Sequence, residues 1–449
     1  MHDGAPQDTA NVADTLASQR ADAVLSGPKG PVVTTRELFM QSTSSYRKIL
    51  GLPVLTIGVL LLSGCATTGN RAGAEGGLEG LEPITLRFSS QETPVAATAA
   101  ATLAFQEYVT EHTDGLITWE NYFSASLVPG PEFLEALSSG ILDVARIPTS
   151  FVPTELRIAN WLVFTGGEPE RMWPMDLVQG MLASNQLYLT SEDVAEEYSA
   201  HGARLLMTQS TGYYPMICSK PVQTLADAEG VRNRVGGGAW NAEAEALGMT
   251  PSVVPVLETY EALQRGIVDC VTIGESGIET YGLWEVGKYV STTQFSTYPG
   301  GFHLAINDEI WSGFPDDVKR VFAAASGLYS EAYVDILIGE HLKILELGVS
   351  EHGLEYLDTP ELNDVLAEHQ RATFASLSDR APDSVTDPEG MLEEYRAYLD
   401  AWAEKWKDGG LPTETEGYEG DLKRAPGLDY GFLFDDMRDS DWYVASFLR

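Results

Sequence analysis

The sequence is poor in basic residues. Only 28 of its 449 residues are Lys or Arg, against 66 Asp or Glu, and the formal charge is −38. Such a surface repels phosphate backbones and anionic headgroups, so we expect neither nucleic-acid binding nor membrane docking through a basic patch. The hydrophobic share of 44% and the charged share of 21% are ordinary for a folded chain, and the length allows about two or three domains.

Motifs of catalytic and cofactor sites are also missing. The sequence has no P-loop and no HExxH, and residues 236–241 do not match GxGxxG. Residues 274–277 (Gly-Glu-Ser-Gly) do not form the GxSxG nucleophile elbow. The acidic cluster at 435–441 lacks the Gly and the distal Glu of a calcium loop. We therefore predict no catalytic residue, no metal and no cofactor. The alternative of a secreted hydrolase would require a nucleophile–base pair, and we find none in the sequence.

Long hydrophobic runs are scarce, and the one at residues 49–62 is too short to span a membrane comfortably. Arg47 and Lys48 precede it, as in a secretory signal, and it ends in Leu-Ser-Gly-Cys65, which resembles a bacterial lipobox. The resemblance implies cleavage before Cys65 and lipidation of that Cys. The alternative is a buried strand or helix that ends in a free Cys.

The lipobox places a signal and propeptide region at residues 1–64, followed by the lipidated Cys and an Ala/Thr/Gly-rich tether at 65–82. A start at Met40 would give a signal of normal size, so Met40 is our hypothesis for the true start. If Cys65 carries lipid, two of the three Cys remain, Cys218 and Cys270. Outside the cytosol they can form a disulfide, and two unpaired thiols are the open alternative.

The sequence contains an internal repeat. Residues 129–143 and 255–269 are identical at eight of fifteen positions without a gap, including Gly140/Gly266 and Asp143/Asp269. Each copy reads as a short helix that ends at Gly, followed by a buried strand. Upstream of each copy lie two further predicted strands and a helix, at residues 84–123 and 231–256. Each half is thus βαβαβ, which favours an α/β fold with a parallel sheet and helices on both faces.

Residues around the second copy resemble a known family, the extracellular solute-binding subunits of tripartite ATP-independent periplasmic (TRAP) transporters, dicarboxylate-binding type. The motif runs through these segments: Lys220–Val222, Gly230–Gly236, Pro255–Asp269 and Asn307–Pro315. The likeness covers about residues 83–380. It implies a two-domain periplasmic-binding-protein clamshell, hinged by strands at about 203–208 and 213–218, by a returning strand at 302–307 and by a long helix at 315–346. Such a clamshell captures an organic acid for an ion-coupled membrane permease.

The resemblance also implies a principal ligand residue, Arg234. An Arg fork binds a carboxylate through two hydrogen bonds. Arg234 ends a predicted strand before three Gly and a helix N-terminus, and bare amides there favour an anion. The alternative for Arg234 is a surface Arg paired with an acid. We expect Arg232, which we place on the opposite strand face, to be structural. Many members carry a second Arg where this chain has Tyr213 and Tyr214, so we expect a ligand with one acidic group and an apolar or hydroxylated body.

Further candidates come from the other strand ends, where ligands sit in such sheets. For each aromatic candidate the alternative is core packing, and for Arg146 it is a structural ion pair. The predicted ligand residues are Arg234, Arg146, Trp240, Tyr213, Tyr214, Gln91, Ser90, Glu275, Thr149 and Tyr298.

We expect domain I at residues 83–208 and 300–380, domain II at 209–299, and a C-terminal helical extension at 381–449 with a helix at 388–407 and irregular structure after it. The predicted function is an extracytoplasmic, lipid-anchored, monomeric solute receptor. Its partners would be a small organic acid and the TRAP permease subunits. A receptor for an ABC importer or a sensor kinase is the alternative.

Overall fold

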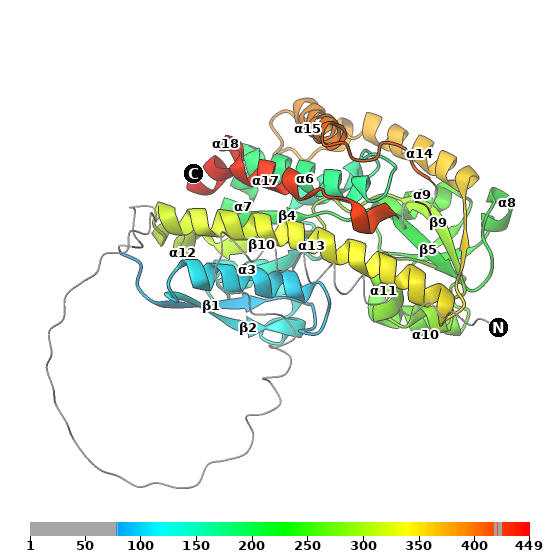
Figure 1. Ribbon diagram of the computed structural model, residues 1–449, viewed down its shortest axis with the longest axis horizontal. Coiled ribbons are helices and arrows are strands. Elements are labelled where there is room, and N and C mark those ends of the chain that lie inside the picture. The colour runs from blue at the N-terminus through cyan, green and yellow to red at the C-terminus, as the bar shows by residue number, and fades with distance from the viewer. Residues whose placement is uncertain (1–77, 79, 417–419, 421–423) are drawn as a thin grey trace, which may run out of the picture.

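The computed structural model describes residues 78, 80–416, 420 and 424–449, and the predicted signal, Met40 and Cys65 lie outside these residues. The chain forms two mixed sheets with helices packed around them (Figure 1). The first sheet has the order β2-β1-β3-β10-β4 and the second the order β11-β9-β5-β8-β6-β7. The strands are β1 (Ile84–Ser89), β2 (Ile117–Tyr122), β3 (Val144–Pro148), β4 (Ala203–Gln209), β5 (Tyr214–Cys218), β6 (Arg232–Val235), β7 (Thr250–Val253), β8 (Cys270–Thr272), β9 (Tyr289–Phe295), β10 (Phe302–Asn307) and β11 (Glu355–Leu357).

The α-helices complete the architecture. Their bounds are α3 (Ala99–His112), α4 (Phe133–Ser138), α5 (Arg157–Leu162), α6 (Met175–Thr190), α7 (Glu192–Ser199), α8 (Leu225–Ala228), α9 (Ala239–Ala246), α10 (Thr259–Gln264), α11 (Glu275–Thr280), α12 (Asp308–Gly313), α13 (Asp316–Ser350), α14 (Pro360–Ala375), α15 (Pro388–Asp408), α17 (Gly431–Asp439) and α18 (Asp441–Leu448).

The repeat builds the same unit in both sheets, as predicted. β1 pairs in parallel with β2 and β3, and β6 pairs in parallel with β7 and β8. The repeated helices are α4 and α10, and each is followed by a Gly with positive φ, 70° at Gly140 and 63° at Gly266. A residue with a Cβ is strained in that region, so Gly at these two positions allows each helix to turn into its strand.

The last residue of each repeat makes the same ion pair. Asp143 accepts hydrogen bonds from the guanidinium of Arg87 at 2.9 and 2.7 Å and from its backbone N–H at 2.7 Å. Asp269 accepts the equivalent three bonds from Arg232, each 3.0 Å long. Each Asp thereby ties the end of its repeat to the first strand of its unit. Arg232 therefore has the structural role that was predicted, but, being two residues before Arg234 on β6, it lies on the same strand face and not on the opposite one.

Strands of the two sheets alternate along the chain. It leaves the first sheet at β4, enters the second at β5, returns from β9 to β10, and reaches the second sheet again at β11. The sequence predicts β4, β5 and β10 but not β9. It also predicts a strand at 354–357 within domain I, whereas β11 pairs in parallel with β9 and lies in the second sheet.

Two helices span both halves. Along α13, Tyr329 and Ile338 pack in the core around the first sheet, and Ile344 packs in a core of the second. Along α14, Leu366 packs with the second sheet and Phe374 with the first. By length and composition α13 is the one helix among the described residues that could cross a membrane, but 61% of its most apolar window is buried in the protein, so we interpret it as a core helix.

The C-terminal residues form helices rather than the irregular structure expected after residue 407. α17 and α18 lie along α13, and α15 packs on α6 (Figure 1). Phe434 and Phe447 are buried in the first core, and the Arg438 guanidinium bonds Glu331 of α13 at 2.8 Å. The apolar residues of this short, charge-rich segment pack on helices remote in sequence, among them α13, α6 and α12.

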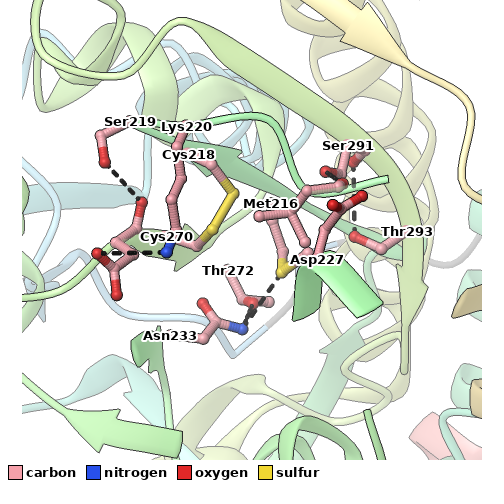
Figure 2. The surroundings of a disulfide bond; sticks show 12 residues. Met216, Cys218, Ser219, Lys220, Asp227, Asn233, Cys270, Thr272, Ser291 and Thr293 are labelled. Carbon is pink, nitrogen blue, oxygen red and sulfur yellow. Dashed lines mark hydrogen bonds and ion pairs between the residues drawn. A yellow bond between two sulfur atoms is a disulfide. The ribbon is translucent and has the colours of Figure 1, made fainter. Parts of the chain in front are cut away.

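Cys218 and Cys270 form a disulfide, which settles the alternative left open by the sequence. The two residues are direct partners on the antiparallel strands β5 and β8, with Cα atoms 4.0 Å apart. Figure 2 shows the bond beside Asn233 of β6, whose side chain points toward Met216 and Thr272. The disulfide thus joins the crossing strand β5 to the repeat unit of the second sheet.

Candidate functional site

Arg234 lies near the carboxyl end of β6 with 9% of its surface exposed. Its Nε donates to the carbonyl of Val254 at 3.0 Å, and its Nη1 to the carbonyl of Thr272 at 3.4 Å. These carbonyls end the neighbouring strands β7 and β8, so the two flanking strands hold the guanidinium. Burial lowers the pKa of Arg234, and the hydroxyls of Tyr281 and Tyr214 oppose this shift. An Arg side chain nevertheless stays charged at neutral pH.

Among the described residues, the structure shows no ion pair between Arg234 and a carboxylate. A guanidinium has five N–H donors, and two of them are accounted for by the strand-end carbonyls. A buried charge is normally paired. The site therefore holds a positive charge that a ligand anion could neutralise.

Tyr214, whose hydroxyl interacts with Arg234, belongs to an aromatic group. The ring of Trp240, in the first turn of α9, is 4.7 Å from the ring of Tyr214 and 5.4 Å from that of Tyr298. The indole N–H donates to the carbonyl of Ser296 at 2.8 Å, and the N–H of Tyr298 donates to Thr211 at 3.0 Å. These rings thus join α9 to both segments that cross between the sheets.

A second buried Arg comes from the first sheet. Arg146 of β3 is 5% exposed, and its Nη1 lies 3.4 Å from a carboxylate oxygen of Glu92. Its Nε donates to Gln209 at 2.9 Å, and its guanidinium lies 3.8 Å from the centre of the Phe302 ring. Burial opposes the charge of Arg146, yet Glu92 and the hydroxyl of Tyr329 raise its pKa overall. Arg146 is therefore already balanced by the protein.

Tyr333 of α13 connects the two Arg environments. Burial raises the pKa of its hydroxyl and the charge of Arg146 lowers it. Burial also raises the pKa of Tyr214, and the hydroxyl of Tyr333 acts in the same direction. Tyr214 in turn interacts with Arg234. Tyr333 thus interacts with Arg146 of the first sheet and with Tyr214 of the second.

One acidic residue, Glu275, lies in the helix that packs against Tyr214. Glu275, the first residue of α11, accepts from Nδ1 of His341 on α13 at 2.8 Å. A Cβ placed on Gly274 would lie 3.4 Å from the ring of Tyr214, so the start of α11 is packed against that ring. The charge of Glu275 also contributes to the raised pKa of Tyr214.

Four of the predicted ligand residues are engaged by the protein itself. The Tyr213 hydroxyl donates to the carbonyl of Pro169 at 2.7 Å, and Thr149 donates to the carbonyl of Gly300 at 2.9 Å. Buried Ser90 accepts from the N–H of Glu92 at 3.0 Å. The exposed Gln91 packs over a glycine of the loop before α4. Among the remaining candidates, Trp240 contacts Tyr214 and Tyr298. Tyr214 interacts with Arg234 and lies against the start of α11, which carries Glu275, whereas Arg146 pairs with Glu92 in the first half.

Several residues of this region were not predicted. Tyr329 and Tyr333 lie one helical turn apart on α13, a spacing that places both on one face. Tyr281, His341, Gln209 and Asp176 gave no signal in the sequence, because their positions depend on contacts between remote segments. A surface cavity of about 360 Å³ between α9 and α14 is lined by none of the predicted ligand residues.

The fold and the site define a solute-binding protein, and the comparisons identify its family. Residues 176–373 match the model for bacterial extracellular solute-binding proteins, family 7. This match, together with the relatives below, confirms the resemblance to TRAP solute-binding proteins that the motif predicted. It is an extracytoplasmic component of a transporter and not an enzyme, which confirms both of those predictions.

Individual relatives show the same architecture. The chain is 25% identical to the C4-dicarboxylate-binding periplasmic protein DctP of Rhodobacter capsulatus, over 65% of this chain and 83% of the relative. It superposes on a TRAP solute-binding protein of Rhodoferax ferrireducens in complex with benzoate, with a TM-score of 0.61 and 16% identity, over 72% of this chain and 99% of that one. A protein of Bordetella bronchiseptica with bound mandelate gives a TM-score of 0.58 and 22% identity, over 71% and 99%. These matches confirm the predicted fold class.

Proposed function

We propose that the chain captures a small organic acid with one carboxylate between its two sheets and delivers it to an ion-coupled TRAP permease. The observation that carries this proposal is the buried guanidinium of Arg234, which makes no ion pair with any described carboxylate. A ligand carboxylate would neutralise it through charge-assisted hydrogen bonds.

The balance of charges favours a monoanion. Arg146 is paired with Glu92, and Glu275 lies close to the ring of Tyr214. A second ligand carboxylate would therefore meet an acid or an Arg that is already neutralised. The rings of Tyr214, Trp240 and Tyr298 offer apolar faces for the rest of the ligand. Relatives crystallised with benzoate and mandelate support this choice, whereas the DctP relative is named for C4-dicarboxylates.

The test is calorimetric titration with benzoate, mandelate and succinate. We expect Arg234→Ala to lose about 2–5 kcal/mol of affinity for the monocarboxylate that binds most tightly, because the ligand carboxylate would be buried without a partner. Arg232→Ala is the matched control, since Arg232 lies two residues earlier on the same strand and its guanidinium bonds Asp269. Unchanged affinity in Arg234→Ala, or tighter binding of succinate than of both monocarboxylates, would refute the proposal.

We propose that the two sheets with their helices move as two domains. The crossing segments between β4 and β5 and between β9 and β10, together with α13 and α14, would form the hinge. Ligand binding would shift an open arrangement toward a closed one. Small-angle scattering with and without the bound monocarboxylate tests this, and an unchanged radius of gyration would argue against closure.

We further propose a lipid anchor at Cys65 and a TRAP permease as the partner. The lipobox-like residues 62–65 support the anchor, and family membership supports the permease over an ABC importer or sensor kinase. Mass analysis of the mature N-terminus tests the anchor, and a mature chain that retains residues before Cys65 would exclude it. Uptake that requires ATP hydrolysis rather than an ion gradient would exclude the permease assignment.

A further inference from the structure

Asp176 is a buried acid that the proposed capture of the anion does not use. It lies in the first turn of α6 and is 3% exposed. One carboxylate oxygen, Oδ2, accepts the N–H of Tyr213 at 2.9 Å, while the other, Oδ1, is buried and has no hydrogen-bond partner among the described residues. Burial raises the pKa of Asp176 to about 7, although the backbone N–H groups of Tyr213 and Leu177 oppose this shift.

The groups that face Asp176 come from three other elements. The carboxylate of Glu275 on α11 raises its pKa further, and His341 on α13 lowers it. Glu275 and His341 are themselves in contact at 2.8 Å, and the His341 ring stacks on Trp173 at 4.5 Å. From the crossing segment, Tyr213 presents its N–H, and its ring lies 4.9 Å from the guanidinium of Arg171.

This cluster straddles the two halves of the molecule. Asp176 belongs to a helix of the first core, Glu275 to a helix of the second half, and His341 to the spanning helix α13. The relative position of the two halves therefore sets the distance between the carboxylates of Asp176 and Glu275. The N–H that Asp176 accepts belongs to the connection between β4 and β5, so any movement of that connection also changes the environment of this acid.

We infer that Asp176 is a proton-binding site coupled to solute capture, so that the protein takes up a proton on the Asp176 carboxylate as it binds the anion. The inference rests on the proposed function. Two effects have the same sign. The bound anion adds a negative charge to the region between the two halves, and closure on it excludes water from the cluster around Asp176. Both disfavour the ionised form of Asp176. The proton comes from the buffer and stays on the carboxyl group, with no other bond formed or broken.

Proton uptake has a thermodynamic consequence for the solute. If the anion favours protonation of Asp176, protonation of Asp176 favours the anion to the same extent. We expect about half a proton taken up per ligand near pH 7.5, and equivalently an affinity that falls about threefold per pH unit there. Benzoate and mandelate are fully ionised throughout this range, so the ligand itself contributes no proton.

Glu197 provides a matched control. Burial raises its pKa to about 7 as well, and its carboxylate accepts the N–H of Ile158 at 2.7 Å. This contact joins α7 to α5 within the first half of the molecule, so solute capture should not change it. Glu197→Gln therefore removes a titrating acid with a similar pKa and should leave the coupling between proton and solute intact.

The experiment is calorimetry of the full chain with the tighter of benzoate and mandelate, in buffers of different ionisation enthalpy near pH 7.5. The slope of the observed heat against buffer enthalpy gives the protons taken up. We expect about half a proton for the wild type and for Glu197→Gln, and none for Asp176→Asn. Binding without proton uptake, or uptake that persists in Asp176→Asn, would overturn the inference. Absence of binding by all three carboxylates would instead contradict the proposed function.

A second variant guards against loss of folding in Asp176→Asn. Glu275→Gln removes the neighbouring charge that raises the pKa of Asp176, so proton uptake at the same pH should fall to less than half its wild-type value. Uptake equal to that of the wild type in this variant would also count against the inference.

Discussion

At the residue scale, Arg232 and Arg234 lie on one strand but have different partners, and we assign them different roles. The side chains are two residues apart but differ in environment, since Arg232 is exposed and bonds Asp269 while Arg234 is buried and bonds strand-end carbonyls. The duplicated pair of Arg87 with Asp143 shows that the role of Arg232 belongs to the repeat. Arg234 has no equivalent in the first unit, where Ser89 stands two residues after Arg87. The unpaired charge therefore belongs to the second unit alone.

Glu197 leads to a prediction on stability. Its pKa in the folded state, about 7, lies above the ordinary value of a Glu, so its stabilising contribution is full below about pH 4 and is lost as the pH rises through about 7. Near pH 8 we expect the free energy of unfolding of Glu197→Gln to exceed that of the wild type by about 1–2 kcal/mol. The variant no longer buries a negative charge at this pH, and its amide oxygen can still accept the N–H of Ile158. Urea unfolding at several pH values measures this, and curves for the two proteins that stay parallel from pH 4 to 8 would disprove it.

At the scale of elements, the repeated units depend on how their strands are tied together. In the second sheet, β5 comes from the crossing segment and β8 from the repeat, and the Cys218–Cys270 disulfide joins them (Figure 2). β8 also supplies the Thr272 carbonyl that holds Arg234. The strand that enters the second sheet and the strand whose carbonyl holds Arg234 are thus connected through one covalent bond.

Loss of the disulfide should destabilise the protein more than it weakens binding. The two Cys are 52 residues apart, and a cross-link of that span stabilises a fold by about 2–4 kcal/mol. We expect the double variant Cys218→Ala, Cys270→Ala to lose about this much unfolding free energy. Its affinity for the monocarboxylate should stay within about fivefold, because the Val254 carbonyl still holds Arg234. Chemical denaturation and calorimetry check the two parts, and reduction of the wild type should reproduce the loss of stability.

At the scale of the whole molecule, the strongest feature is the charge of −38. Residues 1–64 contain five basic and five acidic residues, so the full net charge lies on the chain after the predicted signal. Few of the acids near the protein surface have a basic partner available, and the compact state is destabilised by repulsion between them. Because acids outnumber basic residues by 66 to 28, most Arg side chains have acids available to pair with, and a buried Arg without an ion pair to a described carboxylate is unusual in this chain.

Salt should therefore stabilise the protein. Screening shortens the range of repulsion from about 30 Å at 0.01 M salt to about 3 Å at 1 M. We expect the thermal midpoint to rise by roughly 3–8 °C between low salt and about 0.5 M NaCl. Differential scanning calorimetry measures this shift. An equal concentration of an uncharged osmolyte controls for exclusion effects, and a midpoint that falls with salt would contradict the prediction.

The sequence by itself determined the parts that depend on local pattern. The repeat predicted both parallel units, since eight identical positions specify the same helix, glycine turn and buried strand. Alternation of side chains along β6 puts Arg232 and Arg234, two residues apart, on the same face, so the prediction of opposite faces was wrong, and their different partners separate their roles. The family motif predicted the solute-binding class, and Tyr214 and Trp240 were selected from their positions near the hinge and the helix start.

Only the tertiary structure decided what depends on partners remote in the chain. β9 was missed because its buried positions include Ser291 and Thr293, polar residues that become acceptable inside only when partners such as the Val222 carbonyl are in place. Likewise, β11 joins the second sheet because β9 is there to pair with it. The segments after residue 408 become helices because they pack on α13. Asp176, Glu275 and His341 lie far apart in sequence and meet only because both halves pack against α13, and burial at that junction determines their charges.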